Sequence, residues 1–362
     1  MNLRITIISA LTLIGVLTGS AVAEVTPFFQ PLGVLEGFEN SEAAGISHDG
    51  TAVSGRCFSD SGAQTAMRWT ATDGMIALGS MGGVAQGHGV SNGGHVVVGV
   101  SQHPDGTYEA FRWTAATGME GMGATIASAC SADGSVIVGM GPGARPFRWT
   151  EESGVVVLPG WAGPANDVSA DGSVVVGHVG VGDLAYNAFR WDESGGWEVL
   201  PAPEGAEATS AMGISADSSA IVGHVWDGLS GHSRVVMWNG AESPIFLPQL
   251  PSGRYPWRAG AISGDGSVVA GSAHGESGFS AFVWDQQRGS REFVDVLVNE
   301  CGIDLMGWMP TDVYEISADG LTLVGVAVAP DGHEEAFVAR IPEPGGFALM
   351  LVAAAAALRR KR

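Results

Sequence analysis

The sequence Val168-Ser169-Ala170-Asp171-Gly172-Ser173-Val174-Val175-Val176-Gly177 decides the fold, because variants of it recur along the chain. Each variant has a Ser, then in most cases Asp-Gly, then a run of mostly β-branched residues that ends in Gly. The seven copies begin, 38 to 54 residues apart, at Ser47, Ser91, Ser131, Ser169, Ser215, Ser263 and Ser317. Self-similarity at this period is typical of folds in which every repeat is one supersecondary unit.

Asp-Gly accepts the backbone angles of a tight turn, so each copy is expected to be a hairpin between two strands. We expect the Asp to accept hydrogen bonds from its own turn. Ca²⁺ binding is the alternative for these acids, but it needs six to eight oxygens and each turn supplies one carboxylate. No cofactor is therefore expected. The six residues are Asp49, Asp133, Asp171, Asp217, Asp265 and Asp319.

Two further strands follow each hairpin. The third strands are predicted at Ala66–Trp69, Ala110–Trp113, Pro146–Trp149, Ala188–Trp191, Val236–Trp238, Ala281–Trp284 and Ala336–Ala339. The fourth are predicted at Ile76–Met81, Met119–Met122, Val155–Leu158, Trp197–Leu200, Ile245–Leu250 and Phe293–Leu297. The seventh repeat has no fourth strand, but a similar segment, Leu32–Leu35, precedes the first repeat.

This arrangement predicts an all-β fold, a seven-bladed β-propeller of four-stranded blades closed by the N-terminal strand. Leu32–Leu35 would then pair beside Glu335–Arg340 and complete the last blade. An open β-solenoid is the alternative, but it has no need to begin with the strand that its last repeat lacks.

The repeats resemble the bacterial extracellular HAF repeats over about Leu32 to Arg340. They share Leu-Gly, then the Ile-Ser-x-Asp-Gly-Ser-Val-Val-Val-Gly pattern, then Ala-Phe-Arg-Trp. The resemblance implies an extracellular location and no established enzymatic activity. The His that names the family is absent, and its positions are taken by Thr65, Glu109, Arg145, Asn187, Ser280 and Glu335.

The two ends of the chain are expected to direct export. Residues 1–23 have a basic start, an apolar core and a small-residue cleavage site, which predicts a signal peptide cut after Ala23. The propeller is then residues 24–341. Residues 342–362 contain Pro342, Glu343 and Pro344, an apolar run from Gly345 to Leu358 and four basic residues.

This tail resembles the PEP-CTERM sorting signal of Gram-negative envelope and exopolysaccharide-associated proteins. The resemblance implies transient insertion of the tail in the inner membrane and removal by an exosortase-like protease. An ordinary single-span anchor is the alternative. In both cases the body lies outside the inner membrane, in the envelope, at the cell surface or in the medium.

The charge and cysteine content limit the partners. The formal net charge is −21, and the only Lys, Lys361, lies in the tail. So acidic a surface argues against nucleic acid and anionic lipid. Three cysteines, Cys57, Cys130 and Cys301, allow one disulfide at most.

The loops between strands four and one, and those between strands two and three, should lie on one face of the ring. Aromatic residues in these loops could form platforms for sugar rings. The candidate binding residues are Phe38, Trp161, Trp226, Tyr255, Trp257 and Trp308. Seven of the nine His are expected on the same face: His88, His103, His178, His224, His232, His274 and His333.

We therefore expect a secreted, non-enzymatic binding or matrix module for extracellular polysaccharide or surface partners. The first alternative is a propeller enzyme that acts on polysaccharide, which acids with raised pKa values in the central pocket would favour. The second is a purely structural matrix protein, which a flat, polar loop face would favour. No catalytic motif is present.

Overall fold

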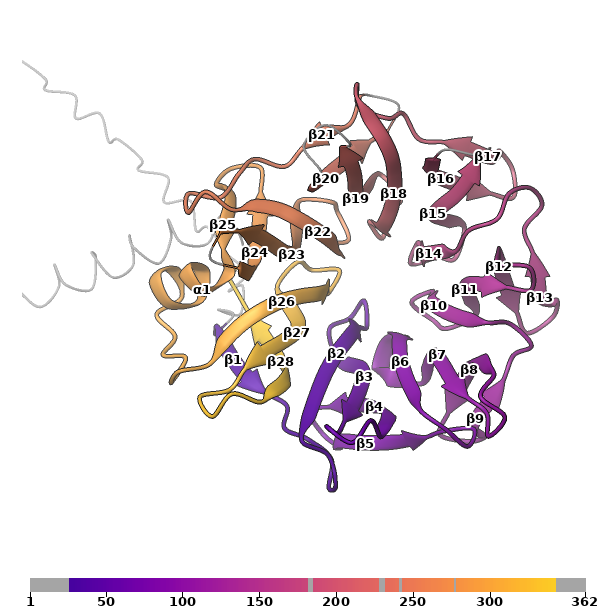
Figure 1. The fold of residues 1–362 in the computed structure, drawn as a ribbon, viewed down its shortest axis with the longest axis horizontal. Coiled ribbons are helices and arrows are strands. Elements are labelled where there is room, and N and C mark those ends of the chain that lie inside the picture. The colour runs from indigo at the N-terminus through magenta and orange to yellow at the C-terminus, as the bar shows by residue number, and fades with distance from the viewer. Residues whose placement is uncertain (1–25, 182–184, 228–231, 241–242, 277, 343–362) are drawn as a thin grey trace, which may run out of the picture.

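The computed structural model describes residues 26–181, 185–227, 232–240, 243–276 and 278–342. In these residues seven antiparallel sheets of four strands each are arranged in a ring around a central axis (Figure 1). The predicted seven-bladed β-propeller is thus confirmed, and the open solenoid is not the fold. The first strand of each repeat lies nearest the axis, so seven inner strands line the centre of the ring (Figure 1).

From the axis outward, the first blade is β2 (Asn40–Ile46), β3 (Ala52–Phe58), β4 (Gln64–Thr70) and β5 (Gly74–Gly79), and the second is β6 (Ala85–Val90), β7 (Val96–Gln102), β8 (Tyr108–Thr114) and β9 (Gly118–Gly121). The third blade is β10 (Ile126–Cys130), β11 (Val136–Gly141), β12 (Arg145–Thr150) and β13 (Gly154–Val157), and the fourth is β14 (Ala165–Val168), β15 (Val174–Val181), β16 (Ala185–Asp192) and β17 (Gly196–Val199). The fifth blade is β18 (Ala206–Ile214), β19 (Ala220–Asp227), β20 (His232–Asn239) and β21 (Ile245–Phe246). The sixth is β22 (Tyr255–Ile262), β23 (Val268–Gly275), β24 (Gly278–Asp285) and β25 (Gly289–Glu292). The seventh is β26 (Met309–Ile316), β27 (Thr322–Val328), β28 (Glu334–Arg340) and the N-terminal strand β1 (Phe28–Pro31). The short helical elements are η1 (Asn92–Gly94), α1 (Phe293–Asp295) and the π-helical turn η2 (Val296–Glu300).

The N-terminal strand closes the ring, as predicted, but it lies a few residues earlier than expected. β1 (Phe28–Pro31) pairs with β28, with Phe28 opposite Arg340 and Pro31 opposite Phe337. Of the predicted segment Leu32–Leu35, only Leu32 continues this pairing, through its backbone N–H to Ala336 O at 2.8 Å. The residues after Leu32 lead into β2, the first inner strand.

The repeated Ser-x-Asp turns follow the predicted mechanism. In the third blade the Ser131 hydroxyl donates to Asp133 Oδ1 at 2.7 Å, and the backbone N–H of Ser135 donates to the same oxygen at 2.9 Å. Gly134 takes a φ of 72°. Hydrogen bonds from its own hairpin thus satisfy Oδ1 of this carboxylate, and among the described residues no group of three or more His, Cys, Asp or Glu could hold a metal ion.

A β-bulge in every inner strand explains the Gly that ends each β-branched run. In the fourth blade Ala165 pairs with Gly177 and Asp167 with Val176, so Asn166 is the extra residue. The bulge brings the carbonyl of Pro164 close to β15, the second strand of the blade. A Cβ at Gly177 would lie 2.2 Å from Pro164 O. Only Gly fits this close approach.

The hydrophobic core lies between neighbouring blades. The Phe of the third strand is fully buried in five blades, and each such burial contributes roughly 1.5–3 kcal/mol. These residues are Phe111, Phe147, Phe189, Phe282 and Phe337. In one core, for example, Ala52 and Leu78 of the first blade pack with Val97 and Phe111 of the second.

The predicted fourth strand at Phe293–Leu297 is wrong. The fourth strand of the sixth blade is β25, and the chain then turns into α1 and η2. Phe293, Val296 and Leu297 are spaced as on a helix and are buried in the core beside the seventh blade. Burial of one face of this short helix decides its conformation. The cysteines Cys57, Cys130 and Cys301 are free, so no disulfide forms among them.

The predictions for the two ends fall largely outside the described residues. These are the signal peptide with its cut after Ala23, and Glu343, Pro344 and the apolar run that follows. Pro342 is the last described residue and is buried. In the described part of the chain no helix has the length and apolar character needed to cross a bilayer.

Candidate functional site

Two of the six predicted aromatic residues border one cavity. Trp226 at the end of β19 and Trp257 in β22 line a pocket of about 620 Å³ together with Tyr186 of β16. The exposed fractions are 44% for Trp226, 36% for Trp257 and 59% for Tyr186. Three neighbouring blades thus contribute one large aromatic side chain each. We call this cavity the aromatic pocket.

The other four predicted residues lie outside the aromatic pocket. Trp161 packs edge-on against Trp197, with ring centroids 6.1 Å apart. Tyr255 is exposed but does not line the pocket. Phe38 and Trp308 are partly buried against the cores beside the first and seventh blades. These two fill gaps in the packing, as aromatics in long loops often do.

The floor of the aromatic pocket carries a small polar network. His178 Nδ1 lies 2.9 Å from Ser210 Oγ, and Asn166 Nδ2 donates to Ala211 O at 2.7 Å. Burial, together with the nearby His224, lowers the pKa of His178 to about 4. Burial also lowers the pKa of His224, with a smaller contribution from Arg258. Both imidazoles are therefore neutral at neutral pH.

Arg258 lies where the aromatic pocket meets the axis of the ring. Its Nη2 donates to Asp312 Oδ2 at 3.1 Å, and its guanidinium carbon lies 4.8 Å from the centroid of the Tyr314 ring. Burial raises the pKa of Asp312 to about 6 although the Arg258 charge opposes the change. The Asp312 carboxylate and the Tyr314 ring, both from the seventh blade, thus stabilise the positive charge of Arg258.

A second cavity, of about 250 Å³, lies on the axis and is lined by all seven inner strands. We call it the axial pocket. It shares Asn166, Met212 and Arg258 with the aromatic pocket, so the two cavities are neighbours. Its walls include Ile46, Ile214, Ile262 and Ile316. The mixture of an aliphatic wall with a few converging polar groups is typical of a small-molecule site.

Two carboxylates enter the axial pocket from equivalent positions. Asp167 and Glu315 each follow the bulge residue of their inner strand. The other five blades have only Gly or Ala there: Gly45, Gly89, Ala129, Gly213 and Ala261. Neither acid is among the site residues predicted from the sequence, although each stands two residues before the Ser of its repeat. Alignment of the seven copies on that Ser would have exposed them.

Both carboxyl groups have raised pKa values. Burial raises the pKa of Asp167 to about 7, although its oxygens accept hydrogen bonds from Val168 N and Ile214 N. Burial and, next, the charge of Asp167 raise the pKa of Glu315, whose Oε1 accepts from Ile316 N at 3.0 Å. The two acids therefore hold a proton more readily than ordinary carboxylates do.

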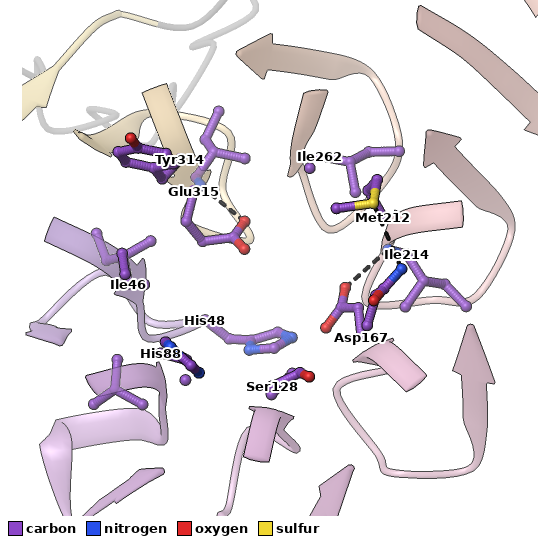
Figure 2. A pocket seen from close by; sticks show the side chains of 18 of the residues that line it. Ile46, His48, His88, Ser128, Asp167, Met212, Ile214, Ile262, Tyr314 and Glu315 are labelled. Atoms are coloured by element: carbon purple, nitrogen blue, oxygen red, sulfur yellow. Dashed lines mark hydrogen bonds between the residues drawn. The ribbon is translucent and has the colours of Figure 1, made fainter. Parts of the chain in front are cut away.

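Two histidines complete the axial pocket. The side chain of His48, from the first hairpin, points to the middle of the pocket between Glu315, Asp167 and Ser128 (Figure 2). Burial lowers its pKa. His88 Nδ1 lies 2.9 Å from Ala127 O, and burial lowers the pKa of this ring too. His88 was expected among the aromatic loops, but it is the bulge residue of β6 and lines the axis.

No family model matches the chain, and no curated protein is a detectable relative. Solved structures resemble it. The β-propeller domain of the Trilobed protease from Pyrococcus furiosus is 13% identical, and the match covers 83% of this chain and 95% of that one with a TM-score of 0.54. Oligogalacturonate lyase in complex with manganese is 12% identical over 88% of this chain and 98% of that one, with a TM-score of 0.52.

TolB from Acinetobacter baumannii is 14% identical over 67% of this chain, with a TM-score of 0.49, and the chain spans only 63% of its length. At these identities the likeness to the protease domain and the lyase shows the β-propeller fold alone.

Proposed function

We propose that the protein is an exported binding module whose aromatic pocket holds a sugar unit of an extracellular polysaccharide. The observation that carries the proposal is the convergence of Trp226, Trp257 and Tyr186 on one cavity of about 620 Å³. Flat aromatic faces bind the apolar faces of sugar rings, and Ser210, Asn166 and His178 supply hydrogen-bonding groups beneath them. A cavity with aromatic walls is the opposite of the flat, polar face expected of a purely structural matrix protein.

Replacement of the two tryptophans tests this function. Trp226→Ala and Trp257→Ala should each weaken binding to a polysaccharide about tenfold, which corresponds to roughly 1.4 kcal/mol of lost contact. Binding is measured by affinity electrophoresis against neutral and acidic polysaccharides, after a glycan array has identified those that bind. Trp161→Ala is the matched control, because Trp161 is similarly exposed (41%) but lies outside the pocket. Equal affinity in all three variants would reject the proposal.

Export and sorting belong to the same proposal. The basic and apolar start of the chain and the Pro342-Glu343-Pro344 tail support export, cleavage after Ala23 and processing by an exosortase-like protease. Fractionation of cells that express the full chain, and the same chain ending at Ile341, tests this. Identical mass and location of the two proteins would contradict a sorting role for the tail.

One observation favours a second function, an enzyme that acts on polysaccharide. Asp167 and Glu315 face one pocket, and both have raised pKa values. A carboxyl group that keeps its proton near neutral pH can act as a general acid, and an ionised partner can act as the base. Release of reducing ends by the parent protein, lost in Asp167→Asn and Glu315→Gln, would establish catalysis. Binding without any release supports the binding module instead.

A further inference from the structure

The axial carboxylates occupy positions that hold only Gly or Ala in the other five blades. At the equivalent Gly45 and Gly213, a Cβ would lie 2.1 Å from His88 O and 2.0 Å from Gly260 O of the next blade. Asp167 and Glu315 thus depart from the small residues found at this position elsewhere in the ring. Two blades of the seven carry this departure, and both direct a carboxylate into the same cavity (Figure 2).

No cationic side chain of the described residues is paired with these two carboxyl groups. Among the described residues neither Asp167 nor Glu315 forms an ion pair, and Arg258, the only Arg that lines the pocket, is bound to Asp312. Both Asp167 oxygens and Oε1 of Glu315 accept backbone N–H groups. Oε2 of Glu315 accepts none of these bonds, and each of the other three oxygens keeps a second lone pair for a ligand. A cationic donor in the pocket would provide the missing partner.

The surroundings decide which kind of cation fits. A divalent metal ion needs about six oxygen ligands, whereas Asp167 and Glu315 together offer four carboxylate oxygens, three of which also accept a backbone N–H. In the part of the chain that the structure describes, no cluster of three metal-binding side chains occurs. The isoleucine walls and Met212 offer contacts for an alkyl group instead. An ammonium group donates few hydrogen bonds and carries its own apolar chain, so it matches both features.

We propose that the axial pocket is a second ligand site, separate from the aromatic pocket, which binds a small molecule with a protonated aliphatic amine. The ammonium group lies between Asp167 and Glu315, and the alkyl chain contacts Ile214 and Ile262. The site goes beyond the proposed sugar-binding function and does not depend on it. The cavity of about 250 Å³ restricts the ligand to a few carbon atoms.

Binding of a cation should release protons from the pair, because the ammonium charge lowers the pKa of both carboxyl groups. Affinity therefore rises with pH, by up to about tenfold per unit below the Asp167 pKa of about 7. The other titratable groups that line the pocket, from the remaining blades and the first hairpin, are His48, His88, Cys130, Arg258 and Tyr314. Burial keeps His48 and His88 neutral in this range, and the Cys130 thiol has its pKa raised to about 12, so these three add no charge.

Isothermal titration calorimetry of the folded protein at pH 8 tests the proposal. The probes are n-butylammonium and putrescine, with 1-butanol and butyrate as uncharged and anionic analogues and CaCl₂ and MnCl₂ as metal ions. We expect one amine per chain, no binding of butanol or butyrate, and proton release measured in buffers of different ionisation enthalpy. Binding of no amine at millimolar concentration, or equal binding of butanol, overturns the proposal. Binding of Ca²⁺ or Mn²⁺ in place of the amines assigns the pocket to a metal and also overturns it.

Two variants locate the site. Asp167→Asn and Glu315→Gln should each weaken amine binding at least about tenfold, or roughly 1.4 kcal/mol. Asp105→Asn, in an exposed turn, and Trp161→Ala, outside both pockets, should leave it unchanged. Thermal unfolding of each variant shows whether it is folded. Full amine affinity in both axial variants would overturn the proposal, whereas loss of sugar binding in Trp226→Ala would not affect it.

Discussion

Ser41 Oγ accepts a hydrogen bond from the backbone N–H of Ala336 at 2.9 Å, although 295 positions separate the two residues. The same hydroxyl donates to Gly33 O at 2.7 Å. Ser41 is fully buried, and it therefore joins the closing segment, the first inner strand and the last repeat. Closure of the ring depends on side-chain bonds as well as on the β1–β28 pairing.

Ser41→Ala should lower the free energy of unfolding by about 1–3 kcal/mol, because it leaves the buried N–H of Ala336 and the partly buried carbonyl of Gly33 without their partner. Ser54→Ala is the control, since Ser54 donates to His88 O at 2.7 Å between two consecutive blades. We expect both variants to lose stability in denaturant, but only Ser41→Ala to become more sensitive to proteolysis near the N-terminus. Equal proteolysis rates in the two variants would contradict this role of Ser41.

Gly177→Ala should destabilise the fourth blade, because its Cβ would lie 2.2 Å from Pro164 O, a backbone atom that cannot move easily. Strain of this kind typically costs about 1–3 kcal/mol. Gly180→Ala in the same strand is a matched control, since the nearest atom to its Cβ would be Ala162 O at 3.8 Å. Urea unfolding of both variants measures the difference. Similar midpoints would show that the bulge can relax.

The repeat pattern was sufficient to predict the architecture, and the physical reason is local. Six blades use the Ser-x-Asp turn and all seven have the Gly opposite the bulge, so the sequence repeats both features. The strand that becomes α1 was mispredicted because Phe293–Leu297 is a short apolar run, which suits a buried strand and a buried helix equally well. Packing against the seventh blade decides between the two.

The functional sites were harder to predict because they lie where repeats differ. Trp226 and Trp257 were expected on one face, yet no pattern in the sequence separates them from Trp308, which packs against a core and is partly buried. Asp167 and Glu315 were missed because they are 148 positions apart and meet only across the axis. The available signal was the position two residues before the repeat Ser, which holds an acid in these two repeats and Gly or Ala in the other five.

His178 should remain neutral well below the usual range of histidine. Its pKa of about 4 results from burial and from His224 nearby. Nuclear magnetic resonance of labelled imidazoles should therefore show no titration of His178 between pH 6 and 8. His333 provides the internal contrast, because hydrogen bonds to Glu335 and Asp331 raise its pKa. Titration of His178 above pH 6 would show that its imidazole is more exposed to water than the pocket geometry implies.

Asp167 and Glu315 should reduce the stability of the protein at alkaline pH. Their pKa values are raised in the folded state, to about 7 for Asp167, so the folded protein keeps protons that the unfolded chain loses as the pH rises above about 4. Stability from these groups is therefore present in acid and is lost as the pH rises. Asp167→Asn and Glu315→Gln should unfold at a higher temperature than the parent at pH 8, and the difference should vanish near pH 4.

Asp133→Asn is the control of opposite sign. Hydrogen bonds from Ser135 and Ser131 lower the pKa of Asp133, so its ionised form stabilises the fold and the variant should be less stable than the parent at pH 8. Calorimetric unfolding of the three variants from pH 4 to 8 measures all of these differences. If Asp167→Asn and Glu315→Gln also lower the unfolding temperature at pH 8, the two carboxylates have partners that stabilise their charge. If they raise it, the axial pair reduces stability, as expected of groups that serve a ligand.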